Sequence, residues 1–127
     1  MIMGKIIVVT NNPLVKKNYE KNVFIEYYEV DLLSLLEKVR DKIHLGYKLL
    51  THPLSGSVKP NETPYKTIII SKEDKLDNDS LVMIENSILT TKKLLSYKKT
   101  PNWQQKILED FQVVDLSLIQ GVIERLL

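Results

Sequence analysis

The polar segment THPLSGSVKPNETPYK, residues 51–66, contains the side chains best suited to bind an anion. Ser55, Gly56 and Ser57 offer two hydroxyls on a flexible backbone, and Lys59 adds a cation two positions later. Hydroxyls, backbone N–H groups and an ammonium are the usual ligands of a carboxylate or phosphate. A second interpretation stays open, in which the loop only turns the chain and its Ser and Asn side chains bond to their own backbone.

His52 is the candidate acid/base residue of this segment. It follows a predicted strand and precedes Pro53, and an imidazole exchanges protons near neutral pH. The other histidine, His44, falls in the last turn of a predicted helix, where it would complement the helix dipole. The local spacing of these histidines shows no zinc motif, and we expect neither a metal nor a cofactor.

A second polar group, Thr10, Asn11 and Asn12, follows the β-branched run at residues 5–9. A continuous run of this kind is typical of a strand buried on both faces, and such strands usually belong to parallel sheets. Asn12 followed by Pro13 has the form of an N-cap and first helical residue, which predicts a short helix to about Tyr19. The N-terminus of that helix would favour an anion.

Three more strands and one clear helix follow along the chain. Residues 23–28, 47–51 and 67–71 are rich in β-branched and aromatic side chains, which predicts strands. Asp31 is placed to open a helix that Gly46 ends. The apolar residues of this helix recur at helical spacing: Leu32, Leu36, Val39 and Ile43.

The C-terminal half is predicted to be helical. One helix, capped by Asp79 or Ser80, extends to about Tyr97, and a second starts at Thr100–Pro101 with Trp103 facing inward. Residues 111–116 fit either a continuation of that helix or a short strand before a last helix. Ser117 with Gln120 has the capping-box form that the second alternative requires.

This order of elements predicts a single α/β domain over residues 1–127. The expected form is a three-layer sandwich with a mainly parallel sheet of four or five strands, flavodoxin- or Rossmann-like, and a helical C-terminal part. If the first and third strands are neighbours, their carboxyl ends flank a topological switch point, where ligands bind in open α/β sheets. Residues 10–12 would then face Thr51 and His52.

Composition limits the classes of function. The net charge is +2, from 18 basic and 16 acidic side chains, which is too balanced to indicate nucleic acid or an anionic membrane. The chain has no cysteine, which excludes disulfides, a thiolate nucleophile and a thiolate metal site, and fits an intracellular protein. The apolar run at residues 6–9 is too short for a signal sequence or a membrane span, so a cytoplasmic protein is expected.

A nucleic-acid partner is the weakest of the functional alternatives. Four lysines could contact phosphates, but no interleaved aromatic platform accompanies them, and they are expected to form a solvated helix face: Lys92, Lys93, Lys98 and Lys99.

Three segments together carry a family resemblance. They are TNNP near the start, VRDKIHLGYKLLTHPLSGSVKPNETPYKTIIIS at residues 39–71, and DFQVVDLSLIQGVIERL near the end. In these segments the chain resembles the GrdX family, small proteins encoded beside the glycine, sarcosine and betaine reductase complexes of amino-acid-fermenting anaerobic bacteria. The positions that match the family motifs lie in two groups: Asn11, Asn12 and Pro13, and then His52, Pro53, Ser55, Gly56, Ser57, Lys59, Pro60, Asn61, Glu62, Thr63 and Tyr65.

The resemblance implies an accessory role in glycine or betaine reduction, with reductase subunits as candidate partners. Without cysteine or selenocysteine the chain cannot be a redox-active reductase subunit. Our first hypothesis is a non-redox binding protein that takes a small anion or a reductase component through loop 51–66. The residues expected to bind are Thr10, Asn11, Asn12, Ser55, Gly56, Ser57, Lys59, Asn61 and Tyr65.

The alternative hypothesis is a small enzyme acting on a carboxylate or acyl phosphate. In that case His52 is the acid/base, and Ser55, Ser57 and Lys59 hold the anion. The sequence does not decide whether the protein is an enzyme.

Overall fold

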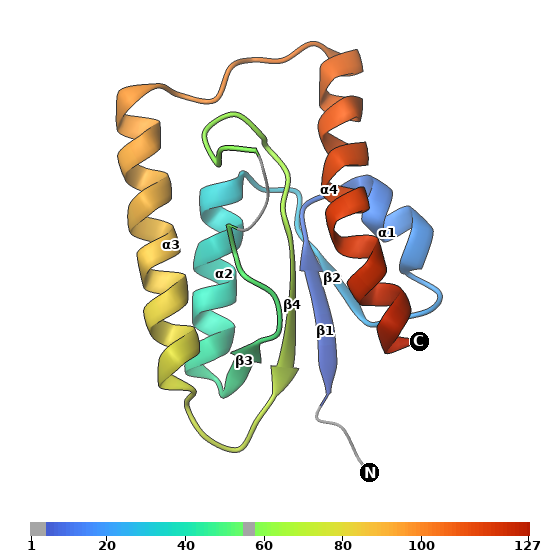
Figure 1. Cartoon of the computed structure of the whole chain (residues 1–127), viewed down its shortest axis with the longest axis vertical. Helices are drawn as coiled ribbons and strands as arrows, with labels where there is room; N and C mark the ends of the chain where they lie inside the picture. The colour runs from blue at the N-terminus through green and yellow to red at the C-terminus, as the bar shows by residue number, and fades with distance from the viewer. Residues whose placement is uncertain (1–4, 55–57) are drawn as a thin grey trace.

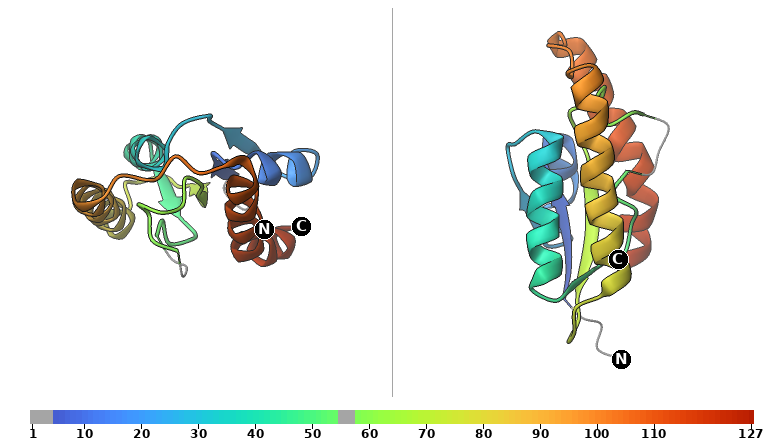
Figure 2. Two further views of the ribbon diagram at one scale, coloured as in Figure 1. Left: turned by 90° about the horizontal axis from the view of Figure 1, so that it is seen from above. Right: turned by 90° about the vertical axis from the view of Figure 1, so that its left-hand side faces the viewer.

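The computed structural model describes residues 5–54 and 58–127. This part of the chain forms one four-stranded sheet with helices on both faces (Figure 1 and Figure 2). The strands are β1 (Ile6–Thr10), β2 (Ile25–Tyr27), β3 (Tyr47–Leu49) and β4 (Thr67–Lys72). The helices are α1 (Pro13–Tyr19), α2 (Leu32–His44), α3 (Asn78–Tyr97) and α4 (Gln105–Leu126). The prediction of an α/β fold with a sheet of four or five strands is therefore confirmed.

The prediction of a mainly parallel sheet is wrong. The strand order is β2-β1-β4-β3, and β4 runs antiparallel to both of its neighbours, which leaves β1 and β2 as the parallel pair of the described sheet. The first and third strands are not neighbours, because β4 lies between them. Parallel neighbours need a crossover connection, usually a helix, whereas the described parts of the chain between β3 and β4 contain no helix.

The central position of β4 explains why its sequence favoured the wrong sheet type. Five of its six residues are buried, with β1 on one side, β3 on the other and helices over both faces. A central antiparallel strand covered in this way carries the same continuous apolar run as a strand of a parallel sheet. The apolar sequence of β4 therefore indicates burial on both faces of the sheet, and it does not indicate the direction of the strand.

Two hydrophobic cores flank the sheet. On the face covered by α2 and α3, the buried side chains include Ile7, Val9, Ile68 and Ile70 from the sheet, Leu35 and Val39 from α2, and Ile84 and Ile88 from α3. On the face covered by α1 and α4 they include Val8, Ile69, Val15, Tyr19, Ile119 and Ile123. Figure 2 shows the two pairs of helices on opposite sides of the strands.

The predicted helix signals of the N-terminal half are confirmed. Asn12 caps α1 by accepting a hydrogen bond from the N–H of Leu14, and Asp31 caps α2 through the N–H of Ser34. Gly46 follows α2 with a φ of 99°, a conformation that glycine adopts without strain. A Cβ there would also lie 3.2 Å from the backbone carbonyl oxygen of Glu73, which is a tight contact, so both the backbone conformation and the space favour glycine.

The helix starts predicted in the C-terminal half are wrong. Helix α3 is capped by Asp77 and not by Asp79 or Ser80. Helix α4 begins at Gln105 and not at Thr100–Pro101, because residues 98–104 cross from α3 on one face to α4 on the other (Figure 1). Extended backbone spans about twice the distance per residue of a helix, so it suits this crossing. Residues 111–116 lie within α4, which decides between the two alternatives for that segment.

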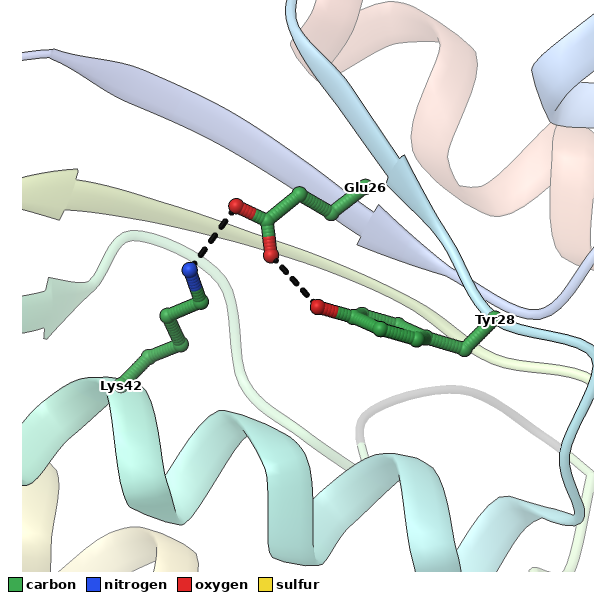
Figure 3. A network of polar contacts seen from close by, with 3 residues as sticks. All are labelled: Glu26, Tyr28 and Lys42. Atoms are coloured by element: carbon green, nitrogen blue, oxygen red, sulfur yellow. Dashed lines mark hydrogen bonds and ion pairs between the residues drawn. The ribbon is translucent and has the colours of Figure 1, made fainter.

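A half-buried ion pair joins β2 to α2 (Figure 3). The Lys42 ammonium donates to Glu26 Oε2 at 2.8 Å, and the Tyr28 hydroxyl donates to Glu26 Oε1 at 2.8 Å. Burial alone would raise the pKa of Glu26, but these two hydrogen bonds outweigh it and hold the pKa below its usual value. The bond to Glu26 in turn raises the pKa of Lys42.

We expect Glu26→Gln to lower the free energy of unfolding by about 0.5–1.5 kcal/mol at pH 7. Because the folded-state pKa of Glu26 is depressed, its contribution is present above the unfolded pKa of about 4.3 and is lost as pH falls. The difference between the two proteins should therefore shrink from about pH 5 to pH 3. Urea unfolding at several pH values measures it.

Glu20→Gln is the matched control, since Glu20 pairs with Lys16 at 4.0 Å and both side chains are about half exposed. We expect a change of less than about 0.5 kcal/mol there. A difference for Glu26→Gln that stays constant down to pH 3 would contradict the assignment.

Candidate functional site

The polar ends of β1 and β3 lie at the same edge of the sheet, although β4 separates the two strands. Thr10, the last residue of β1, pairs with Thr67 at the start of β4. Just beyond β3, the Thr51 hydroxyl accepts a hydrogen bond from the N–H of Ile69, also in β4. Residues 10 and 51 therefore lie at one edge of the sheet, but the predicted pairing of the first and third strands is wrong, because β4 lies between them.

Four buried residues form a closed hydrogen-bonded ring at this edge, which we call the Asp115 ring: Thr10, Asn12, Thr67 and Asp115. The Asn12 backbone N–H donates to the Thr10 hydroxyl at 3.0 Å, and the Thr10 and Thr67 hydroxyls lie 2.8 Å apart. Thr67 donates to Asp115 Oδ2 at 2.6 Å, and Asn12 Nδ2 donates to the same oxygen at 3.0 Å. Because Thr67 gives its only proton to Asp115, Thr10 must be the donor to Thr67.

Asn11 fixes the loop end that precedes β4. Its side-chain amide donates to the carbonyls of Val30 and Pro64 at 2.9 and 2.8 Å, and its side-chain oxygen accepts from the N–H of Lys66 at 2.9 Å. The side chain is 3% exposed, so all three bonds are shielded from water. Asn11 therefore positions Lys66.

The remaining predicted ligand residues are spread along the loop. Asn61 donates to the carbonyls of Leu94 and Lys98 at the end of α3, and its Oδ1 is buried without a hydrogen-bond partner among the described residues. The Tyr65 hydroxyl accepts from Gln112 Nε2 at 2.9 Å, and Lys59 is exposed. Ser55, Gly56 and Ser57 lie outside the described residues. The structure thus gives Asn61 and Tyr65 contacts within the fold and does not bring Lys59 to the Asp115 ring.

Trp103 binds the middle of the loop between β3 and β4. Its indole N–H donates to the Glu62 carbonyl at 2.8 Å, and its ring packs against Phe111 with centroids 5.5 Å apart. It comes from the extended connection between α3 and α4 and not from a helix.

A cavity of about 120 Å³ lies between α4 and the edge of the sheet, and we call it the α4 groove. Its sheet-side and loop-side wall is polar: Thr51, His52, Lys66 and Thr67. Its helix-side wall combines one carboxylate with apolar side chains: Asp115, Leu118, Ile119 and Val122. A smaller cavity of about 20 Å³ shares Lys66, Asp115 and Leu118 with it.

Opposite charges line this groove. Burial lowers the pKa of Lys66, while the negative charge of Asp115 raises it in part. Asp115 is 5% exposed and belongs to the buried ring described above. The groove therefore holds a cation that is partly withdrawn from water beside a fixed carboxylate.

The histidine of the groove has a defined tautomer. His52 Nδ1 accepts a hydrogen bond from the N–H of Leu54 at 2.9 Å, so the neutral ring carries its proton on Nε2. In this form His52 is a hydrogen-bond donor through Nε2. His44 lies exposed in the last turn of α2, as predicted, and does not line the groove.

Sequence reasoning missed Lys66, Thr67 and Asp115. Lys66 ends the polar loop 51–66 but is not among the ligand residues that the sequence predicts. Thr67 begins a predicted strand, and Asp115 lies in residues 111–116, which fit either a helix or a strand. The signal for Asp115 was available: in a helix, positions 115, 119 and 123 share one face, and the other two are isoleucines. A carboxylate on such a face must find buried donors.

No group of three or more His, Cys, Asp or Glu side chains in residues 5–54 and 58–127 could hold a metal ion. None of the helices described there is long and apolar enough to cross a membrane.

The fold and site define a small open-sheet α/β protein with a charged groove at one sheet edge. The family model of GrdX-like proteins matches residues 7–124, so the chain belongs to the GrdX-like protein family. No curated protein and no solved structure matches the chain.

We expect Asn11→Asp to lower the free energy of unfolding by about 2–4 kcal/mol. The carboxylate keeps the acceptor for the Lys66 N–H but loses both donors and faces the carbonyls of Val30 and Pro64. Chemical denaturation measures the loss. Asn18→Asp, the same change on the exposed side of α1, is the control and should cost less than about 1 kcal/mol. Equal effects of the two changes would show that the Asn11 bonds do not hold the loop.

Proposed function

We propose that this protein is a non-redox accessory component of a glycine or betaine reductase system, and that it binds a small carboxylate or phosphate ligand in the α4 groove. The observation that carries the binding proposal is the position of Lys66. Lys66 lines the groove, and burial lowers its pKa. A charge that is partly withdrawn from water attracts an anion more strongly than a charge at the surface. A lysine has three N–H donors, so it can bind a ligand in addition to its contacts within the protein.

Membership of the GrdX-like family supports the setting. The resemblance associates such proteins with the reductase complexes of amino-acid-fermenting anaerobes, and we therefore place the protein in the cytoplasm of such a cell. A chain without cysteine cannot exchange thiols or selenol with the reductase, so its contribution is binding and not electron transfer. A reductase subunit remains the alternative occupant of loop 51–66.

The binding proposal can be tested by thermal shift with phosphate, sulfate, acetate, acetyl phosphate, glycine, sarcosine and betaine. A ligand that binds the native state raises the midpoint, by an amount that grows with its concentration over Kd. We expect a saturable rise with at least one compound and its loss in Lys66→Met. Lys106→Met, an exposed lysine of α4 outside the groove, should keep the rise.

Two outcomes would count against the proposal. A rise that persists in Lys66→Met places the ligand elsewhere. No rise with any compound removes small-anion binding, and co-purification with reductase subunits then tests the partner alternative.

A second candidate function is catalysis on an acyl phosphate or carboxylate, because His52 lines the groove with a proton on Nε2. In that role the Nε2–H of His52 donates a hydrogen bond to the substrate oxygen on which negative charge develops. We expect hydrolysis of acetyl phosphate by such an enzyme to fall at least 100-fold in His52→Ala. Unchanged turnover in the variant removes His52 from the mechanism, and no turnover by the unaltered protein removes this activity.

A further inference from the structure

The carboxylate of the α4 groove has unused acceptor capacity. Asp115 is 5% exposed, and both hydrogen bonds that it accepts within the described fold end on Oδ2. An ionised carboxylate has about four acceptor positions on two oxygens. Asp115 lines both the groove and the smaller cavity beside it, so Oδ1 is the oxygen left for a donor in these spaces.

A simple anion or a simple cation is attracted by only one of these two charges. An anion at Lys66 also lies in the field of Asp115, which repels it, and the low dielectric of a buried site strengthens that repulsion. A cation at Asp115 is repelled by Lys66 for the same reason. A molecule with an acceptor group at one end and a donor cation at the other is attracted by both residues.

The size of the groove limits the length of such a molecule. Its volume of about 120 Å³ is below the roughly 300–1,000 Å³ of pockets that hold drug-sized ligands, so the groove suits a small molecule. A ligand with a short separation between its two charged groups fits such a space. The apolar wall of Leu118, Ile119 and Val122 suits a short aliphatic segment between them.

We infer that the α4 groove binds a small zwitterion, with its carboxylate at Lys66 and its protonated amine at Asp115. This inference rests on the proposed ligand-binding function and narrows its ligand class. Thr51 and His52 line the groove together with Lys66, so they would lie at the carboxylate end. The Asp115 ring fixes the other end, since Asn12 and Thr67 hold the carboxylate in one orientation.

Isothermal titration calorimetry of the whole protein can test the inference with glycine and with its two halves, acetate and methylammonium. Glycine is the smallest molecule with both groups. We expect glycine to bind at least tenfold more tightly than acetate or methylammonium. In Asp115→Asn the side-chain oxygen can still accept from Asn12 and Thr67, while the new amide NH2 replaces Oδ1 and repels the ammonium. Glycine should then bind no better than acetate.

Asp110→Asn is the matched control, because Asp110 is an exposed carboxylate of α4 outside the groove, and it should leave the glycine preference intact. Acetate binding as tightly as glycine in the unaltered protein would overturn the zwitterion inference and leave anion binding standing. If none of the three probes binds, the zwitterion inference is wrong. If phosphate and sulfate do not bind either, the proposed ligand-binding function is wrong as well. The affinities of the unaltered protein for glycine, acetate and methylammonium test the zwitterion inference even if Asp115→Asn fails to fold.

Discussion

The buried carboxylate of Asp115 is the constraint on which the arrangement of this edge depends. Two donors from different elements meet on one of its oxygens, Asn12 at the start of α1 and Thr67 at the start of β4. An ionised group that is 5% exposed is costly unless it is hydrogen-bonded, so α4 cannot slide or rotate on the sheet without losing those bonds. The ring therefore sets the position of α4, and with it the helix-side wall of the groove.

The loop between β3 and β4 is held from three directions, which explains why it needs no secondary structure in its described parts. Asn11 binds the end of the loop from β1, Trp103 binds its middle from the connection between α3 and α4, and Asn61 reaches the end of α3. The backbone carbonyls of Glu62 and Pro64 and the N–H of Lys66 bond to side chains, where a strand or helix would use its own backbone. The result is a fixed approach to β4 that places Lys66 at the groove.

Local chemistry in the sequence predicted local structure well. The caps Asn12 and Asp31, the glycine turn at Gly46 and the apolar face of α2 follow from interactions within a few residues, and all are observed. Strand order depends on which distant segments pair, and the burial pattern of β4 is the same for either direction of its neighbours. The helix start at Gln105 likewise depends on the distance that residues 98–104 must cross between two faces of the sheet.

The residues of the candidate site also fall into two groups, those that local sequence predicts and those that meet only through the packing of distant segments. The sequence predicted that the polar residues after β1 and β3 lie at the same edge, because the carboxyl ends of strands that run in one direction share an edge of the sheet. They do share that edge, although β4 lies between the two strands. The charged pair was not found, because Lys66 and Asp115 are 49 positions apart in the sequence and meet only through the packing of α4. Lys59, the lysine that the sequence favoured, is exposed, so water screens its charge, whereas burial of Lys66 leaves its charge to be balanced by neighbours or ligand. Binding strength in such a site follows from how far a charge is withdrawn from water, and only the folded chain determines that.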